Sequence, residues 1–359
     1  MTGSIVIDTC GPEGPAVYTP ETLTALESCR TAGDALDLIT RRTHDALLRD
    51  ELPEFWREWE RSGVDVSCLT IGVGWGDEPF TYEAAVRDLA SYKRLFDAGK
   101  FVSVRCPEEA LSARDFGAPG LILTFQNTTH FGDSLVRLEE FFDLGVRIVQ
   151  LTYNTRNLVG DGCMEADPRA LTPFGRQAVK KLNELGIVVD LSHVSEKTSF
   201  DAVSVSDKPV AITHAMARSV YEHDRAKSDD MIKAVGTDGY VGVVLVPFFL
   251  TDEQPATLDH FLAHLDHIVG LVGTDHVGIG TDWSPEFAPR LIELLNAEVT
   301  ALGFREEHAV DFGARVEGID KWADWPNITQ AMREHGYSDD EVNGIAGGNF
   351  LRFFREVAG

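Results

Sequence analysis

The chain has 359 residues, of which 43% are hydrophobic and 25% charged, a composition typical of a globular protein with a large buried core. It carries 32 basic and 58 acidic residues and a formal net charge of −26, and such an acidic surface repels nucleic-acid phosphates and anionic lipid headgroups. Neither nucleic acid nor a membrane surface is therefore expected as a partner.

The sequence carries no recognisable targeting or anchoring segment. The first ten residues lack a basic stretch followed by an apolar one, and no apolar run reaches the roughly 20 residues that a membrane-spanning helix needs. An odd number of scattered cysteines indicates a reducing compartment, not a disulfide framework or a thiolate zinc site. We therefore predict a cytoplasmic protein. The cysteines are Cys10, Cys29, Cys68, Cys106 and Cys163.

Short apolar runs rich in β-branched residues recur along the chain. They are nearly continuous where a half-exposed strand would alternate, so they indicate strands buried on both faces, as in a parallel sheet covered by helices. The runs lie at residues 4–9, 64–73, 121–125, 146–152, 187–191, 210–213, 240–249 and 277–280. Residues 101–106 are a ninth candidate, an extra strand before the run at 121–125.

The segments between these runs have helical spacing, for example residues 81–98, 135–144 and 173–185. The last two are followed by Gly145 and Gly186, the glycine signature of a helix end. Eight strand–helix alternations predict an α/β fold, a (β/α)₈ TIM barrel, and no G-x-G-x-x-G motif follows the first strand to suggest a dinucleotide fold. We predict one domain over residues 1–359, with insertions or lids at about 19–49 and 284–325.

Polar residues stand where these strands end, which in a TIM barrel is the face that carries the active site. His193, His214 and Asp282 each end a separate apolar strand. Burying them costs several kcal/mol unless a metal, a charge or a hydrogen bond compensates. We interpret them as a divalent metal site, with Asp282 as third ligand or as the base for a bound water. The alternative is that each histidine is a hydrogen-bonded structural residue.

Three further histidines form a more conspicuous pattern. His260, His264 and His267 share one face of a predicted helix, and a pair spaced i, i+4 can bind zinc. This helix precedes the last strand, so it belongs to the outer ring, away from the active-site loops. We interpret these histidines as a solvated helix face.

Two arginines follow the strand that ends at His214. In a strongly acidic protein, Arg218 or Arg225 near a metal could clamp the carboxylate of a substrate. A surface salt bridge is an equally good interpretation of either position.

At these residues the sequence resembles the membrane (renal) dipeptidase family of metallopeptidases, within the amidohydrolase-like barrels. Five stretches occur in the family's order: LGVRIVQLTYN at 144–154, GIVVDLSHVS at 186–195, PVAITH at 209–214, HVGIGTD at 276–282 and GGNFLR at 347–352. The resemblance implies a (β/α)₈ barrel, a site for one or two metals and hydrolysis of a dipeptide or similar small amide. Members often form dimers, so it also carries the expectation of a homodimer.

The resemblance assigns roles to individual residues. It implies that His193 and His214 are ligands of one metal, that Asp282 is a ligand of the other, and that Arg225 holds the substrate. Asn154 and Tyr153 stand beside this site and are predicted to contact the substrate, which is expected to be a small molecule with a carboxylate.

Several positions depart from the family's pattern. Cys10-Gly-Pro12 replaces the family's His-x-Asp, and Gln126 replaces the glutamate that bridges two metals. Tyr153 stands where the family has a histidine, and Ala226 replaces the asparagine after the substrate-holding arginine. A neutral glutamine cannot bridge two dications as a carboxylate does, so the departures favour one metal over two.

Two ways of completing the set of metal ligands remain open. A single divalent ion, with zinc favoured, could sit on His193 and His214, aided by Asp282, Gln126 or a water. Alternatively His130, Asp8 or Cys10 could supply the missing ligands.

The leading hypothesis is a hydrolase in which a metal-activated water attacks an amide. Asp282 then takes the proton, Tyr153 donates a hydrogen bond to the oxyanion and Arg225 holds a carboxylate. One alternative is a barrel with lyase, decarboxylase or isomerase chemistry. The other is a catalytically degenerate homologue that binds a ligand.

Overall fold

The computed structural model describes residues 4–73, 80–282 and 286–359. Within them, parallel strands pair in chain order, and this path omits β3, which pairs with β4 alone. The strands are β1 (Ile7–Gly11), β2 (Val66–Thr70), β3 (Val102–Ser103), β4 (Gly120–Phe125), β5 (Val146–Gln150), β6 (Val188–Asp190), β7 (Ala211–Ala215), β8 (Tyr240–Val243) and β9 (Val277–Ile279).

The sheet nearly closes on itself between its first and last strands. The Thr9 hydroxyl of β1 donates to the carbonyl oxygens of Ile279 (3.0 Å) and Thr213 (2.7 Å), and the Asp282 amide donates to the Cys10 carbonyl (2.6 Å). These bonds join β1 to β9, to the residues that follow β9 and, across the barrel interior, to β7. The fold is therefore the eight-stranded parallel α/β barrel that the sequence predicts.

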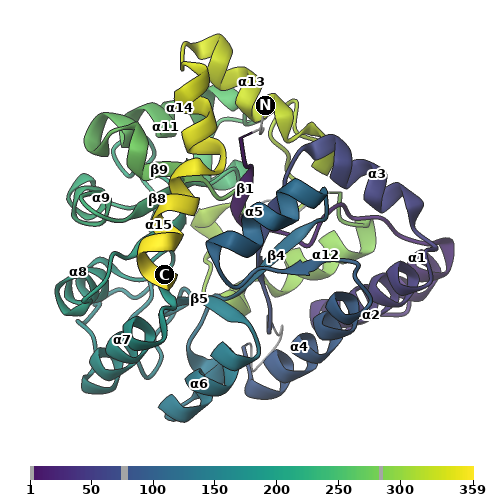
Figure 1. Ribbon diagram of the computed structural model, residues 1–359, viewed down its shortest axis with the longest axis horizontal. Helices are drawn as coiled ribbons and strands as arrows, with labels where there is room; N and C mark the ends of the chain where they lie inside the picture. Colours follow the sequence, from purple (N-terminus) through teal and green to yellow (C-terminus); the bar gives the residue numbers. More distant parts are fainter. Residues whose placement is uncertain (1–3, 74–79, 283–285) are drawn as a thin grey trace.

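Helices surround this barrel (Figure 1). Those of the first half are α1 (Pro20–Leu26), α2 (Ala32–Leu48), α3 (Pro53–Ser62), α4 (Tyr82–Asp97), α5 (Pro107–Phe116), α6 (Leu135–Asp143) and α7 (Pro173–Leu185). Those of the second half are α8 (Glu196–Val205), α9 (Asp229–Gly236), α10 (Pro247–Leu250), α11 (Leu258–Val272), α12 (Pro289–Glu298), α13 (Pro326–His335), α14 (Asp339–Asn343) and α15 (Asn349–Ala358).

The C-terminal helix α15 lies across the strands in Figure 1 and covers one end of the barrel. Its Phe350, Phe353 and Phe354 form a buried apolar cluster with residues from the beginnings of the strands, among them Ile7 and Val66. Because this end is sealed by apolar packing, the opposite end, where the strands finish, is the one left for polar groups.

Most elements lie where the sequence predicts them. Helix α7 has the predicted bounds and ends at Gly186, whose φ of 72° is the left-handed conformation expected of a C-cap glycine. The ninth candidate strand is confirmed as β3. The prediction for residues 240–249 is wrong in its second half: β8 ends at Val243, and the apolar run continues into the short buried helix α10.

The two predicted insertions differ in content. Residues 19–49 hold α1 and α2, and the described part of residues 284–325 holds α12 with short 3₁₀ turns. Residues 284 and 285 lie outside the described residues. That these segments are insertions on a single domain stays a prediction.

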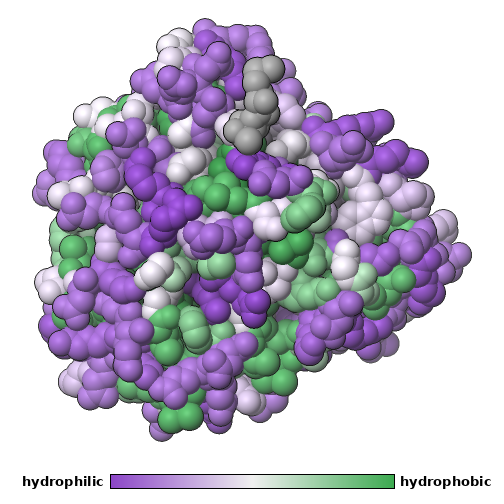
Figure 2. Space-filling model, in the orientation of Figure 1, coloured by the Kyte–Doolittle hydropathy of each residue, from purple (hydrophilic) through white to green (hydrophobic). Residues whose placement is uncertain are grey.

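The surface agrees with the acidic composition. The face seen in Figure 2 is largely hydrophilic, with scattered apolar patches between the helices. Among the helices in the described residues, none combines the length and the apolarity that crossing a bilayer requires.

We expect Gly242 of β8 to be a packing constraint of the barrel interior. A Cβ there would lie 2.0 Å from the Thr213 carbonyl oxygen and 2.8 Å from the Thr9 hydroxyl, so Gly242→Ala should lower the free energy of unfolding by about 1–3 kcal/mol or more. Gly270→Ala in α11 is the matched control, because a Cβ there meets nothing within 4 Å and should stabilise the helix by roughly 0.5–1 kcal/mol. Urea unfolding followed by circular dichroism measures both, and equal stabilities would contradict the packing argument.

Candidate active site

Two histidines face each other at the C-terminal ends of neighbouring strands. His193 follows β6 and His214 lies in β7, both are fully buried, and their Nε2 atoms are 3.0 Å apart. One contact of this length between ring nitrogens is either a hydrogen bond or two lone pairs that share a cation. The bonds on the far side of each ring decide between these cases.

The Nδ1 atom of His193 is a hydrogen-bond donor. It lies 2.7 Å from Oδ1 of Asn154, whose Nδ2 donates to the Leu302 carbonyl (2.9 Å) and thereby fixes the amide orientation. Since an amide oxygen only accepts, Nδ1 of His193 carries the proton. In the neutral ring, Nε2 then holds a bare lone pair.

His214 is oriented in the same way by another partner. Its Nδ1 lies 2.9 Å from the Thr213 hydroxyl, and that hydroxyl donates its own proton to Asp190 Oδ2 at 2.7 Å. The hydroxyl oxygen therefore accepts from Nδ1 of His214, and Nε2 is left bare here too.

The surroundings keep both rings neutral. Burial lowers the pKa of His193 and of His214 well below the ordinary value, and the nearby charge of Arg225 lowers both further. No ring proton is then available to lie between the two Nε2 atoms. Two lone pairs directed at one buried point favour a cation there.

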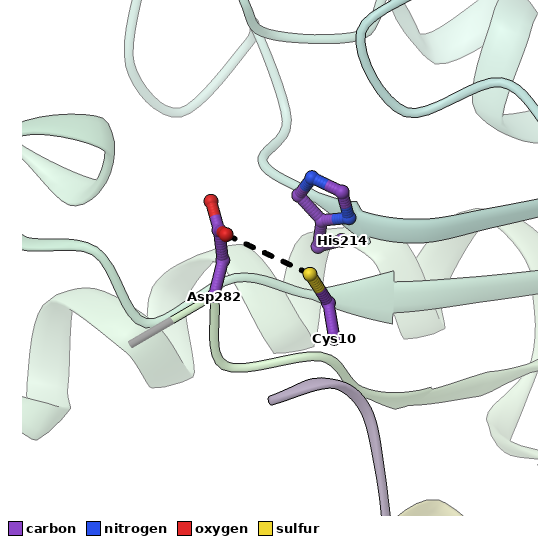
Figure 3. A group of neighbouring side chains, drawn as sticks. All are labelled: Cys10, His214 and Asp282. Carbon is purple, nitrogen blue, oxygen red and sulfur yellow. Dashed lines mark hydrogen bonds between the residues drawn. The ribbon is translucent and has the colours of Figure 1, made fainter. Parts of the chain in front are cut away.

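Cys10 and Asp282 lie beside His214, the second histidine of the pair (Figure 3). Ligand atoms of Cys10, His214 and Asp282 all lie within 4.8 Å of one another, and the Cys10 thiol donates to Asp282 Oδ1 at 3.6 Å. Burial raises the pKa of Asp282 to about 7, and burial together with the Asp282 carboxylate raises that of the Cys10 thiol. Asp282 also has φ of 49°, a strained backbone conformation of the kind found at functional sites.

This donor set fits a divalent metal. Two imidazole nitrogens that bind one zinc ion at about 2.0–2.1 Å lie roughly 2.9–3.4 Å apart, close to the 3.0 Å between the Nε2 atoms here. Imidazole, thiolate and carboxylate together suit zinc or another borderline transition metal. Of the additional ligands that the sequence left open, the group contains Asp282 and Cys10.

Two buried cations hold the loops that carry the histidines. The two terminal nitrogens of Arg225 donate to the backbone carbonyls of Ser192 and, at 2.7 Å, His214. The amine of Lys227 donates to the carbonyls of Leu191 (2.8 Å) and Val194 (2.7 Å), and burial lowers its pKa to about 7. Sequence reasoning missed Lys227 altogether, because a single lysine in a loop carries no signal of burial.

Two of the residues predicted to contact the substrate form hydrogen bonds within the protein. Asn154 is fully buried, with its amide bound to His193 and to the Leu302 carbonyl, so it positions a histidine, and its contact with a substrate stays a prediction. Arg225 is likewise tied to backbone carbonyls, although its buried Nε has no hydrogen-bond partner in the described structure. Its role toward a substrate stays a prediction.

Tyr153 and Gln126 border the cluster. The Tyr153 ring stacks on His193 with 4.2 Å between centroids, and burial, with the Asp282 charge, raises the pKa of its phenol, so the hydroxyl stays a donor. The Gln126 amide donates to the Cys10 sulfur at 3.4 Å. Whether Gln126 is also a metal ligand stays a prediction.

Two other candidate ligands have protein partners of their own. His130 contacts the carbonyls of Asn127 (2.9 Å) and Gly72 (3.0 Å), and the carboxylate of Asp8 accepts from Thr281 (2.6 and 2.9 Å). Neither belongs to the group of ligand atoms formed by Cys10, His214 and Asp282. Arg218 forms an ion pair with Glu196 at 3.1 Å, as its alternative interpretation proposed.

The three histidines of α11 form no common site. His264 is fully buried and accepts from the Ala217 amide at 3.1 Å, His260 caps its own helix, and His267 pairs with Asp229 at 2.8 Å. The prediction of a solvated face is therefore wrong for His264, which is a core residue, because the helix packs this side against the barrel.

A pocket opens from the cluster toward solvent. Tyr153, His193 and Asp282 line it on the side of the cluster, together with residues that follow β8 and residues of the second predicted insertion. The site therefore combines a buried metal-binding cluster with an adjoining pocket that a small molecule can enter.

Comparison with known proteins gives a family match over most of the chain. The model of the membrane dipeptidase family, peptidase family M19, matches residues 60–297, well over half of the chain. The chain belongs to the membrane dipeptidase family. The resemblance seen in the sequence is thus confirmed.

Individual members of the family show how close the likeness is. The dipeptidase tcpJ of Claviceps purpurea is 30% identical over 270 residues, which cover 74% of this chain and 53% of that protein. The uncharacterized dipeptidase C965.12 of Schizosaccharomyces pombe is 34% identical over 269 residues, covering 72% and 58%. The chain thus spans about half the length of these curated relatives.

A solved structure matches almost end to end. The amidohydrolase from Pseudomonas aeruginosa is 28% identical with a TM-score of 0.78, and the match covers 99% of this chain and 96% of that one. The fold of this chain is therefore shared with that amidohydrolase over nearly its whole length.

We expect Asn154 to control the affinity of the cluster for a metal. Asn154→Leu removes the acceptor that fixes the His193 tautomer, so metal affinity should fall about 10–100-fold. Competition with a chromophoric chelator measures it. Asn327→Leu on the exposed side of α13 is the matched control, and an unchanged affinity in a folded Asn154→Leu protein would remove the positioning role.

Proposed function

We propose that this protein is a metal-dependent hydrolase that cleaves a dipeptide or a closely related small amide. The observation that carries the proposal is the pair of neutral, buried imidazoles with their Nε2 atoms 3.0 Å apart at the mouth of the barrel. Membership of the membrane dipeptidase family supports the same chemistry. No observation favours the lyase, isomerase or non-catalytic alternatives.

The proposed ligands are His193, His214, Cys10 and Asp282, around one ion. Zinc is the favoured metal, since imidazole and thiolate are ligands that it accepts readily. When bound, such an ion acts as a Lewis acid and lowers the pKa of water toward neutrality.

The chain's own residues supply the remaining steps. Asp282, whose carboxylate lies beside His214 and lines the pocket, is suited to accept the proton from the attacking water at one carboxylate oxygen. The Tyr153 hydroxyl, on the pocket wall, is placed to donate a hydrogen bond to the oxygen of the amide as negative charge develops there. The buried histidines and the pocket walls exclude bulk water from the reaction.

The proposal extends to partners and location. The substrate is a small molecule with a carboxylate, and nucleic acid and membranes are not expected to bind the strongly acidic chain. The five cysteines are unpaired, which supports the proposal of a reducing compartment such as the cytoplasm. A homodimer remains part of the proposal.

The decisive experiment measures metal and turnover together. Purified protein should contain about one divalent ion per chain by elemental analysis and should hydrolyse members of a dipeptide panel. His214→Ala should lose the metal and at least about 99% of the activity, because it removes a central ligand. His260→Ala, on the outer ring, should change neither. Wild-type protein with neither metal nor turnover would sink the proposal.

Tyr153→Phe tests the oxyanion role separately. Removing one preorganised donor should lower kcat roughly 10²–10³-fold and leave KM nearly unchanged, since the bond strengthens in the transition state. Steady-state kinetics on the best dipeptide measures the split. Tyr82→Phe in α4 is the control, and a change confined to KM would assign Tyr153 to ground-state binding instead.

A further inference from the structure

The pocket beside the cluster has walls of unusual composition. Besides the cluster residues, four phenylalanines line it: Phe248, Phe249, Phe304 and Phe312. Phe248 and Phe249 belong to α10, directly beyond β8, while Phe304 and Phe312 come from the second predicted insertion. An apolar pocket of this kind favours burial of an apolar or aromatic group of the ligand.

Among the residues that the structure describes, Arg315 is the one arginine or lysine that lines this pocket. Its Nη1 donates to the backbone carbonyls of Phe312 (3.2 Å) and Ala314 (2.7 Å), which fixes the position of its head. Among the described residues no carboxylate lies within ion-pair distance of Arg315. Asp311, the acid on the same wall, is instead bound by Asn296 at 2.9 Å and by the Gly313 amide.

Acidic residues outnumber basic ones by 58 to 32 in this chain, and Arg305, beside the site, pairs with Asp224. Arg315 differs from Arg305 in having no such ion pair among the described residues. A half-buried guanidinium with donors to spare, on the wall of an otherwise apolar pocket, is suited to bind a planar anion from solution.

Arg225, which the family resemblance assigns to this task, is placed differently. It is buried, both of its terminal nitrogens are bound to backbone carbonyls of the histidine loops, and it does not line the pocket. A carboxylate that enters the pocket meets Arg315.

We propose that Arg315 binds the terminal carboxylate of the substrate while the phenylalanine walls take the side chain next to it. The protein then prefers dipeptides whose C-terminal residue is apolar or aromatic, with the amide bond directed toward Asp282 and His193. This specificity rests on the proposed hydrolase function. It assigns Arg315 to binding, not to the chemical step.

Kinetics with paired substrates tests the assignment. We expect Arg315→Gln to raise KM for alanyl-phenylalanine roughly tenfold to a hundredfold, as loss of a charge-assisted contact does, with kcat little changed. KM for alanyl-phenylalanine amide, which lacks the carboxylate, should stay the same. Arg315→Lys should restore part of the loss, because it keeps the charge without the planar fork.

Arg290→Gln is the matched control. It removes the same charge from α12, where Arg290 pairs with Glu293 at 2.7 Å, outside the pocket lining. It should leave both KM values unchanged. Equal KM increases for acid and amide in Arg315→Gln would overturn the carboxylate assignment.

A binding measurement separates this inference from the proposed function. The probe is a phosphinate analogue of alanyl-phenylalanine, compared with its C-terminal carboxamide by isothermal titration calorimetry on the metal-loaded protein. Wild-type protein should bind the acid more tightly, and Arg315→Gln should remove most of that preference. If wild type hydrolyses dipeptides but the preference survives in Arg315→Gln, the inference fails alone. If the preference depends on Arg315 but no dipeptide is cleaved, the proposed function fails alone.

Discussion

The arrangement of this molecule depends on two imidazole rings that present bare nitrogens to one buried point. Asn154 and Thr213 each accept a hydrogen bond from Nδ1 on the far side of a ring, so the Nε2 lone pairs of His193 and His214 face each other at 3.0 Å. Such a contact is unfavourable in a low-dielectric interior without positive charge between the nitrogens. The bonds around the rings can therefore be understood as preparation for a cation.

Buried hydrogen bonds in the neighbouring strands and loops hold the two histidines in this arrangement. Asp190 accepts from the Ser192 and Thr213 hydroxyls at 2.6 and 2.7 Å and so ties β6 to β7 at the height of the two rings. Arg225 and Lys227 bind the carbonyls on either side, and within the described parts of the chain neither of these buried basic side chains forms an ion pair with a carboxylate. Each would be costly alone, but charge-assisted bonds to carbonyls compensate for much of the lost hydration.

The barrel could be predicted from the sequence because the same pattern recurs along the chain. Eight apolar runs with helices between them are compatible with few folds. Single boundaries could not, since the apolar run at 240–249 is equally suited to a strand and to the buried helix α10. At the site, the residue types of Asn154 and Arg225 indicated polar roles. They did not indicate which groups these side chains form hydrogen bonds with. Whether an amide faces a substrate or the back of His193 depends on neighbours such as Leu302, which lies far away in the chain.

The charge of the cluster bears on the number of metals. With Cys10 and Asp282 ionised and both histidines neutral, the cluster supplies two negative charges, which balance one divalent ion. A second ion would need further carboxylates, yet Gln126 is neutral and Asp8 is saturated by Thr281 and the Cys10 amide. Replacing a bridging acid by an amide thus removes the charge that a second dication requires. The thiol of Cys10, which accepts from the Gln126 amide at 3.4 Å, lies beside this position and is a ligand of the single ion that we propose.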